Sequence, residues 1–231
     1  MASPDLRARA ATSLSRSRWF AHQPERLRRA LIEKAQISQI EPGRWIYGTG
    51  DALNGLYGVV EGSVHLLAGQ DNALLEIVQA GQLFGQAARF GGGPRLVTAI
   101  AGERSTLLFV PDHAMREISA TEPDVWRNFT ELLYSQLAGA LLLATQSLSQ
   151  PAKRVAARLV LLAAAHGEKD ARLSVTQSQL AEMTGLSRKT VNTHLQALEK
   201  AGVISLSYAH IAVRDGARLR AQAEMETDFL R

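Results

Sequence analysis

The sequence predicts an α+β protein with a β-rich domain, then a long helix, then a winged helix-turn-helix. Short apolar runs separated by glycine lie between residues 41 and 110, as in an all-β sandwich or barrel. A helical segment extends from Pro123 to about Ser149. Residues 176–200 are typical of two capped helices joined by a tight turn.

The composition excludes several kinds of site. The chain of 231 residues suits one large or two modest domains, and it contains no cysteine. Disulfides, thiolate metal sites and cysteine-ligated iron–sulfur clusters are therefore excluded. No apolar run approaches the roughly 18 residues that span a bilayer. The N-terminal arginines are not followed by the apolar core of a secretory signal, so we expect a cytoplasmic protein.

Charge is distributed unevenly along the chain. The formal net charge is +4, yet residues 41–150 hold 6 basic and 11 acidic side chains. Residues 151–231 hold 12 basic and 8 acidic side chains. The middle of the chain would repel a polyanion and the C-terminal part would attract one, so a binding task belongs to the C-terminal part.

The β-rich domain follows an N-terminal helical stretch. Residues 1–16 are expected to be mobile, Trp19 and Phe20 to anchor a core, and Pro24 to open a helix. The strands come from IYGTG, LYGVVEGSVHLLAG, LLEIVQAG and LVTAIAG, and the glycines between them predict one hairpin after another. Pro111 ends the last strand, and a short helix follows.

The long helix is too apolar to be covered on one side only. Apolar and small residues recur at four-three-four-three spacing, the interval of coiled coils, at Leu133, Leu137, Ala140, Ala144 and Ser147. We expect this helix to pack on the β-rich domain and to associate with a second copy of the chain. Burial within one chain is the alternative.

The winged helix-turn-helix begins after Pro151. A helix is expected from Lys153 to Ala165, with Gly167 ending it. The runs VISL and IAV predict a hairpin around Ser207–His210. Residues after Asp215 are expected to form a loosely ordered tail.

Local chemistry defines both ends of the helix-turn-helix. Thr176 and Gln179 form a T-x-x-Q capping box at the start of the first helix. Gly185 stands where the chain must turn, because glycine takes a positive φ at little cost. Ser187 can cap the second helix.

The second helix has two unlike faces. Ser187, Val191, His194 and Leu198 centre on one face, with Leu195 at its edge. The opposite face carries only polar and basic side chains, which suit base edges and phosphates: Arg188, Lys189, Asn192, Thr193 and Gln196. The alternative is an ordinary helical hairpin with a solvated polar face.

Four segments together resemble the bacterial cAMP receptor protein and fumarate-nitrate regulator (CRP/FNR) superfamily of transcription factors. GDALNGLYGVVEGSV is similar to its β-roll motif, and GQLFGQAARFGGGPRLVTA to its phosphate-binding cassette. EPDVWRNFTELLYSQL is similar to the start of its dimer helix, and AEMTGLSRKTVNTHLQALEKAGVI to its DNA-reading motif.

The resemblance implies a homodimeric regulator, not an enzyme, that reads a near-palindromic site with one helix in each of two major grooves. It implies a double-stranded β-helix (β-roll) sensor domain over residues 1–121 and a dimerisation helix over 122–150. The winged helix-turn-helix then covers 151–216, with a tail over 217–231. Double-stranded DNA, a second copy and RNA polymerase are the implied partners.

The cassette departs from the family pattern at its ligand positions. Relatives that sense cyclic nucleotides use a glutamate for the ribose and an Arg-Ser pair for the phosphate. Here Gln86, after Gly85, stands at the first position and Arg95-Leu96 at the pair, while the adenine-contacting Thr-Ser pair aligns with Ala140-Leu141. Leucine cannot donate to a phosphate, and Gln86 is a weaker acceptor than a carboxylate. We therefore expect a degenerate sensor that does not respond to cAMP, with another small effector or none.

We expect no resident cofactor. Haem, which some relatives bind, would need an axial histidine such as His65 or His113, and each stands alone in the sequence. A catalytic metal in a β-barrel would need clustered ligands, and His65 has no such neighbours in sequence.

The resemblance also suggests roles in DNA reading. Arg188 is expected to donate two hydrogen bonds from its guanidinium, one to O6 and one to N7 of a guanine. Lys189 stands where relatives commonly have glutamate, and Thr193 where they often have a second arginine, so the half-site should differ there. Thr176, Gln177 and Ser187 are expected to hold backbone phosphate. The alternative is a helix-turn-helix that binds a partner protein.

Overall fold

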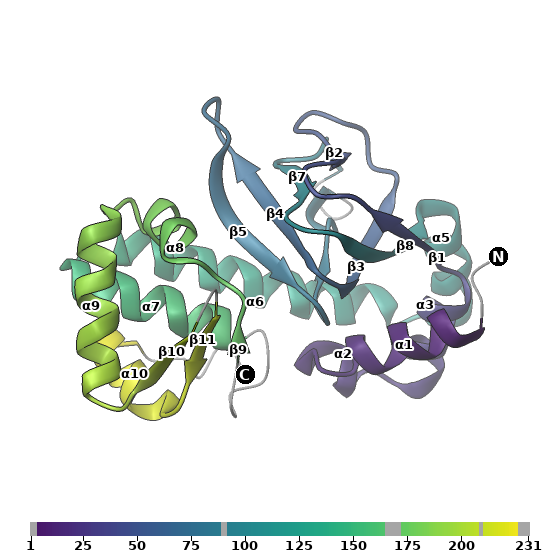
Figure 1. Ribbon diagram of the computed structural model, residues 1–231. Coiled ribbons are helices and arrows are strands. Elements are labelled where there is room, and N and C mark those ends of the chain that lie inside the picture. The colour runs from purple at the N-terminus through teal and green to yellow at the C-terminus, as the bar shows by residue number, and fades with distance from the viewer. Residues whose placement is uncertain (1–3, 89–91, 165–171, 208–209, 226–231) are drawn as a thin grey trace. The chain divides into compact units, whose positions relative to one another are not determined.

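The computed structural model describes residues 4–88, 92–164, 172–207 and 210–225. The chain divides into two compact units, Met1–Leu133 and Tyr134–Arg231. The long helix α6 (Val125–Gln146), labelled in Figure 1, contributes residues to both units. Each unit is described by itself.

Three helices begin the N-terminal unit: α1 (Pro4–Leu14), α2 (Arg18–His22) and α3 (Glu25–Glu33). The expectation that residues 1–16 are mobile is wrong for residues 4–14, and residues 1–3 lie outside the described part. Ala10 and Leu14 of α1 are fully buried, and their burial holds the helix on the β-rich core.

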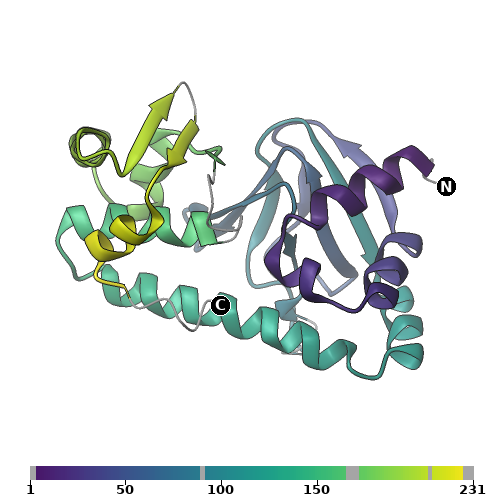
Figure 2. The ribbon, with the colours of Figure 1, turned by 90° about the horizontal axis from the view of Figure 1, so that it is seen from below.

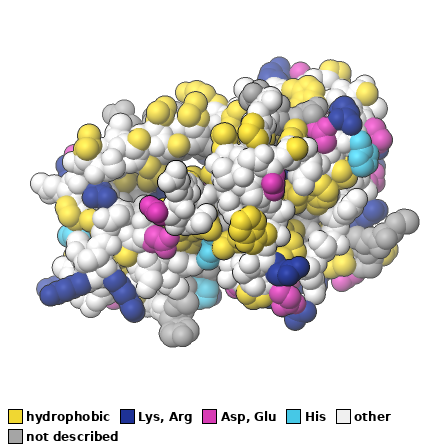
Figure 3. Space-filling view, turned by 90° about the horizontal axis from the view of Figure 1, so that it is seen from above, with side chains coloured by type: hydrophobic (Ala, Val, Ile, Leu, Met, Phe, Trp, Pro, Cys, Tyr) yellow, Lys and Arg dark blue, Asp and Glu magenta, His cyan; other side chains and the backbone are white. Residues whose placement is uncertain are grey.

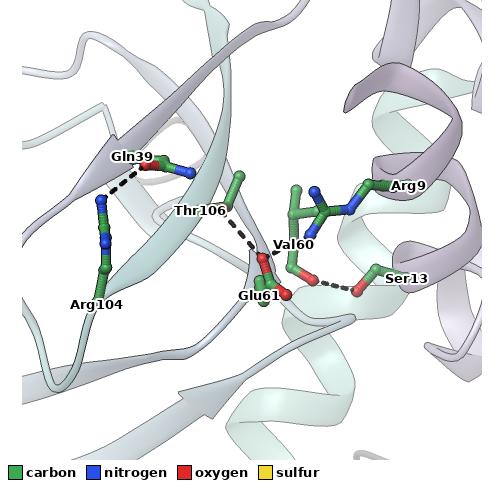
Figure 4. Close-up of polar contacts among 7 residues, drawn as sticks. All are labelled: Arg9, Ser13, Gln39, Val60, Glu61, Arg104 and Thr106. Atoms are coloured by element: carbon green, nitrogen blue, oxygen red, sulfur yellow. Dashed lines mark hydrogen bonds and ion pairs between the residues drawn. The ribbon is translucent and has the colours of Figure 1, made fainter. Parts of the chain in front are cut away.

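Polar contacts also fasten α1 to the end of one strand, as Figure 4 shows. The hydroxyl of Ser13 donates to the carbonyl of Val60 at 2.7 Å. The guanidinium of Arg9 pairs with Glu61 at 2.9 Å, and Thr106 reaches the same carboxylate at 3.5 Å. These bonds fix α1 because they join it to strands far away in sequence.

Two four-stranded antiparallel sheets make the β-roll, so the predicted fold is confirmed. One sheet has the order β1 (Gln36–Ile40), β8 (Ser105–Pro111), β3 (Gly55–Glu61), β6 (Leu83–Phe84). The other has the order β2 (Trp45–Tyr47), β7 (Thr98–Ala101), β4 (Ser63–Ala68), β5 (Ala73–Gln79).

The sequence predicted that the glycines close one hairpin after another, and the structure does not have this arrangement. Of the described strands in this unit, β4 and β5 are the consecutive pair that lie side by side. Gly62 takes the chain from β3 in one sheet to β4 in the other. A Cβ there would lie 2.4 Å from the Ser105 hydroxyl and 2.7 Å from the Arg104 carbonyl. Gly62 therefore permits a close crossing between sheets.

Strand β3 is buried on both faces because two cores meet along it. Tyr57 and Val59 point between the two sheets, with Val64, Phe84 and Leu107. The alternate residues Leu56 and Val60 pack with the helices. Figure 2 shows these N-terminal helices, in purple, lying together against the β-roll.

The helical core also holds the start of α6. Helix α5 (Asp112–Thr121) follows β8, and Val125 and Phe129 of α6 are buried. The indole of Trp19 donates to the carbonyl of Asn128 at 2.7 Å, and its ring lies 4.7 Å from that of Phe129. Trp19 therefore anchors the core, as predicted, and binds the start of α6 to it.

The C-terminal unit contains the predicted winged helix-turn-helix. Its elements are α7 (Pro151–Ala164), β9 (Arg172–Leu173), α8 (Gln177–Thr184), α9 (Arg188–Lys200), β10 (Ile204–Ser207), β11 (His210–Val213) and α10 (Gly216–Ala223). The small sheet has the order β10-β11-β9. Gly167, expected to end α7, lies outside the described residues.

Helix α10 replaces the loosely ordered tail expected after Asp215. Asp215 caps the helix by accepting from the Arg218 amide at 2.9 Å. Leu219 and Ala223 are buried, and α10 packs on α7. A short apolar face among charged residues is therefore enough to dock this segment. Residues 226–231 lie outside the described part.

Candidate functional site

The turn of the helix-turn-helix is built as its sequence predicts. The Thr176 hydroxyl accepts from the Gln179 amide at 3.2 Å, and the Gln179 side chain accepts from the Thr176 amide at 2.8 Å. Gly185 ends α8 with φ of +63°, and its amide bonds back to the carbonyls of Ala181 and Glu182. The capping box and the left-handed glycine thus fix where α8 starts and stops.

An arginine from α7, which sequence reasoning missed, holds the turn from behind. Arg154 donates to the carbonyl of Thr184, the last residue of α8. A Cβ at Gly185 would lie 3.1 Å from the same guanidinium. One turn further along α7, Arg158 is buried and its Nε lies 3.3 Å from the sulfur of Met183. Two arginines four residues apart in a helix that is apolar after Arg154 except for Arg158 were the available signal.

The recognition helix α9 presents the predicted polar face. The Ser187 hydroxyl caps it by accepting from the Thr190 amide at 3.1 Å. Val191, Leu195 and Leu198 are buried, and His194 is half-buried. The exposed residues at its start and along the other face include Ser187, Arg188, Lys189, Thr193 and Gln196, and Ala197, Glu199 and Lys200 near its end are exposed as well. Figure 3 shows Lys and Arg side chains projecting from the C-terminal unit at the lower left.

Two members of the predicted DNA-binding set contact each other. The Gln177 side-chain amide donates to the Asn192 oxygen at 3.1 Å, which ties the start of α8 to α9. Both residues are half-buried, whereas Thr176 is exposed. Thr193 donates to the carbonyl of Lys189 at 3.1 Å, so its hydroxyl lies along its own helix. Arg188, Lys189 and Gln196 are long exposed side chains of this face, followed near the end of α9 by Glu199 and Lys200.

The wing is attached to the recognition helix. The Glu199 carboxylate accepts from the Leu206 amide of β10 at 2.7 Å. Across the hairpin, Arg214 donates to the Ser205 hydroxyl at 3.1 Å. The first bond fixes the position of β10 relative to the end of α9, and the second ties the end of β11 to β10.

Arg95, the expected anion anchor of the cassette, is turned into the β-roll and is 2% exposed. It donates to the carbonyl of Gly85, to the Asn54 side chain at 2.6 Å and to the carbonyl of Gly55 at 2.8 Å. Its guanidinium lies 4.3 Å from the centre of the Tyr47 ring. Arg95 thus donates its hydrogen bonds to three amide oxygens of its own domain.

The surroundings of Arg95 are shaped to receive it. Gly85 has φ of +85°, and a Cβ there would lie 2.7 Å from the guanidinium. Burial raises the pKa of Tyr47 to about 12, although the positive charge of Arg95 acts in the opposite direction. A neutral phenol ring is therefore kept under the cation.

The other cassette positions differ in exposure. Gln86 is buried, whereas Leu96, at the position of the relatives' serine, is 70% exposed. Residues 89–91 of the cassette lie outside the described part. The structure places Gly85 and Arg95 together but does not bring Leu96 into the interior.

The two candidate haem-ligating histidines lie on separate elements. His65 is half-buried on β4 and His113 is exposed on α5. Across the described ranges, no three acidic or histidine side chains gather as a metal-binding group. None of the helices searched in those ranges is both long and apolar enough to cross a membrane.

A row of exposed apolar side chains follows α6 in the C-terminal unit. Tyr134, Leu137 and Leu141 on α6, and Leu148 in the turn just after it, are all more than half exposed, at intervals of three, four and seven residues. Of the predicted seam, Leu137 belongs to this row, whereas Leu133 is half-buried. Ala140, Ala144 and Ser147 of the predicted seam are exposed as well, so Leu141 and Leu148 widen the exposed face beside the seam and do not replace it.

Two family models match the chain. A cyclic nucleotide-binding domain matches residues 37–122, and a Crp-like helix-turn-helix domain matches residues 153–222. The first covers both sheets of the β-roll, and the second covers α7 through most of α10.

Curated relatives match most of the chain. A cyclic AMP receptor protein from Thermus thermophilus is 33% identical over 183 residues, which are 77% of this chain and 83% of the relative. An HTH-type transcriptional regulator, Cmr, from Mycobacterium tuberculosis is 27% identical over 197 residues, 84% of this chain and 79% of the relative.

Solved structures share the fold. A CRP/FNR-family transcriptional regulator from Thermus thermophilus aligns with a TM-score of 0.56 at 26% identity, covering 82% of this chain and 99% of that one. FixK2 from Bradyrhizobium japonicum aligns with a TM-score of 0.65 at 19% identity, covering 81% and 96%.

Proposed function

The chain belongs to the CRP/FNR superfamily of transcriptional regulators, and from that membership we propose that it reads a near-palindromic DNA site as a homodimer without requiring cAMP. The observation that carries the DNA-reading part is the capped helix α9. Its apolar side is buried and its basic and amide side is exposed.

Arg188 supplies the base contact in this proposal. It is exposed in the first turn of α9, the part of a recognition helix that enters the major groove most deeply. Lys189 and Gln196 reach a base edge or a phosphate. Thr193 makes fewer base contacts than an arginine at its position would. Thr176 and Ser187 hold phosphates, while Gln177 and Asn192 keep the two helices in register through their hydrogen bond.

The homodimer is supported by the exposed row on α6. Tyr134, Leu137, Leu141 and Leu148 are large and apolar, and apolar rows at helical intervals are typical of helix pairs. A second copy brings the same row and a second α9, so two half-sites about one DNA turn apart can be read together. Contact with RNA polymerase, as in other members, is part of the proposal.

Independence from cAMP is supported by the position of Arg95. A phosphate anchor must offer free donors toward the ligand, yet Arg95 donates to Gly85, Asn54 and Gly55. Its Nε has no hydrogen-bond partner among the described residues, but that atom is buried, and the whole residue is 2% exposed. Leu96 offers no hydrogen bond and is exposed. The match of residues 37–122 to a cyclic nucleotide-binding domain favours the second candidate, a regulator gated by cAMP or another small effector.

Selection of sites from random duplex DNA tests the proposal. The purified full-length protein is used with and without cAMP at one fixed salt concentration. A palindromic consensus without nucleotide supports the proposal, and a consensus that requires cAMP overturns its nucleotide-independent part. Failure to enrich any sequence overturns the DNA-reading part and favours a protein partner, which a weak salt dependence of DNA affinity would then support.

A further inference from the structure

The N-terminal helices enclose a hollow of about 660 Å³ that the DNA-reading function does not use. Helices α1, α2 and α3 lie together in Figures 1 and 2 and all contribute to it. Apolar side chains line much of it, among them Ala8, Ala11, Phe20 and Ile32. Its volume lies within the range of pockets that bind small molecules.

Two arginines give this hollow an unusual polar lining. Arg7 of α1 and Arg28 of α3 both line it and are half-buried. The Nε atom of each is buried and has no hydrogen-bond partner among the described residues. These Nε atoms face the protein, so the donors that Arg7 and Arg28 can offer to the hollow are their other guanidinium N–H groups.

The remaining charges of the hollow limit the charge of its ligand. Arg29 lies 3.7 Å from Glu33, so these two lining residues offset each other. Glu25, also in the lining, adds one negative charge beside Arg7 and Arg28. The net surplus is a single positive charge, which suits a monoanion better than a dianionic phosphate.

We propose that this hollow binds a small monocarboxylic acid with an apolar tail, such as a medium-chain fatty acid. The carboxylate accepts from the guanidinium groups of Arg7 and Arg28, a charge-assisted contact. The tail lies on Ala8, Ala11, Phe20 and Ile32, where burial of apolar surface adds to the affinity.

The site is positioned to influence α6. Phe20 lines the hollow, and its neighbour Trp19 donates to the carbonyl of Asn128 and packs on Phe129 in the first turns of α6. A ligand that packs on Phe20 therefore contacts the same short helix, α2, whose Trp19 is bonded to α6. This link lies wholly within the N-terminal unit.

Calorimetric titration of the full-length protein tests the proposal, with octanoate as the probe. Octanol and octylamine keep the tail and remove or reverse the charge. We expect octanoate to bind and both analogues to bind at least about tenfold more weakly, since a charge-assisted bond contributes roughly that factor. Arg7→Gln and Arg28→Gln should each weaken octanoate by a similar factor.

Arg26→Gln is the matched control. Arg26 lies on the same helix as Arg28, outside the lining, with its Nε 3.1 Å from Glu122. It should bind octanoate as the native protein does. Equal binding of octanol and octanoate, unchanged binding in both Arg7 and Arg28 variants, or no heat of binding at millimolar octanoate overturns the proposal. No DNA is present, so the result is independent of the proposed regulatory function.

Discussion

At the scale of single residues, the two arginines predicted to contact a ligand or DNA have opposite positions. Arg188 follows a helix cap and is exposed, whereas Arg95 follows a glycine-rich turn and is buried. The first position was predictable because Ser187 and the helical period determine it locally. The second was not, because Asn54, Gly55 and Tyr47 lie 40 or more residues away from Arg95.

Replacing Arg188 should relax reading at one base position. Arg188→Ala should cost about 1–3 kcal/mol of affinity for the selected site, because a bidentate guanine contact is lost. Fluorescence anisotropy on duplexes varied at each position measures this. Lys200→Ala, at the far end of α9, is the control and should keep the native base preference. Equal weakening on every duplex would instead make Arg188 a phosphate contact.

Replacing Arg95 should destabilise the N-terminal unit. Arg95→Met keeps the length but leaves the oxygens of Asn54, Gly55 and Gly85 without their donor, which should cost about 2–5 kcal/mol. All three tryptophans lie in this unit, so their fluorescence during urea unfolding reports on it.

The exposed Arg104 provides the comparison. Arg104→Met should change the unfolding free energy by less than about 0.5 kcal/mol. If Arg95→Met proved equally mild, Arg95 would be a ligand anchor rather than a structural group.

Tyr47 should make the N-terminal unit less stable in alkali. Its pKa is raised to about 12 in the folded state by burial, against about 10 for an unfolded tyrosine. Between these values the unfolded chain binds fewer protons, so the free energy of unfolding falls as pH rises toward 12 and is unaffected below 10.

Tyr47→Phe should therefore flatten the dependence of the urea midpoint on pH between about 10 and 12. Tyr134→Phe removes an exposed hydroxyl and is the control. A Tyr47→Phe profile that is parallel to the native one would show that other groups cause the alkaline loss.

At the scale of elements, the helix-turn-helix was predictable because caps and turn are local signals. The extents of α8 and α9 follow from Thr176, Gly185 and Ser187. Helix α1 was missed because its buried residues Ala10, Ser13 and Leu14 are small or few, so that tertiary contacts rather than pattern reveal it. The crossing at Gly62 was missed because a glycine turn alone does not say whether the next strand stays in the same sheet.

The turn at Gly185 should tolerate alanine poorly. Gly185→Ala adds a Cβ to a residue with φ of +63° and places it 3.1 Å from the Arg154 guanidinium, which is already bonded to Thr184. We expect a loss of about 1–2 kcal/mol in the stability of the C-terminal unit, measured by circular dichroism, and weaker DNA binding.

Gly202 offers a matched position. It has φ of +70° and open space around its Cβ direction, so Gly202→Ala carries backbone strain without the contact. The excess loss in Gly185→Ala measures the contact with Arg154. Equal losses in the two variants would show that backbone strain alone accounts for the effect.

At the scale of the whole molecule, the exposed row on α6 connects stability with DNA reading. A chain that exposes Tyr134, Leu137, Leu141 and Leu148 together has an apolar face that association would cover. The sequence predicted such a face from its spacing, and Leu137, Ala140, Ala144 and Ser147 are exposed. The large apolar residues Tyr134, Leu141 and Leu148 beside that seam were not predicted, because exposure depends on how α6 packs in three dimensions.

A charge in this row should separate the proposed dimer. Leu141→Glu places a carboxylate among Tyr134, Leu137 and Leu148, and two such charges would face each other in a symmetric pair. Sedimentation should show a monomer at concentrations where the native protein is a dimer. DNA affinity should then fall by more than about tenfold, because one half-site no longer assists the other. Gln136→Glu, an exposed position of α6 outside the row, adds the same charge and should leave both properties unchanged.

A Leu141→Glu protein that stays dimeric would mean that another surface joins the two copies. A monomer that binds DNA as tightly as the native protein would mean that reading does not require the pair.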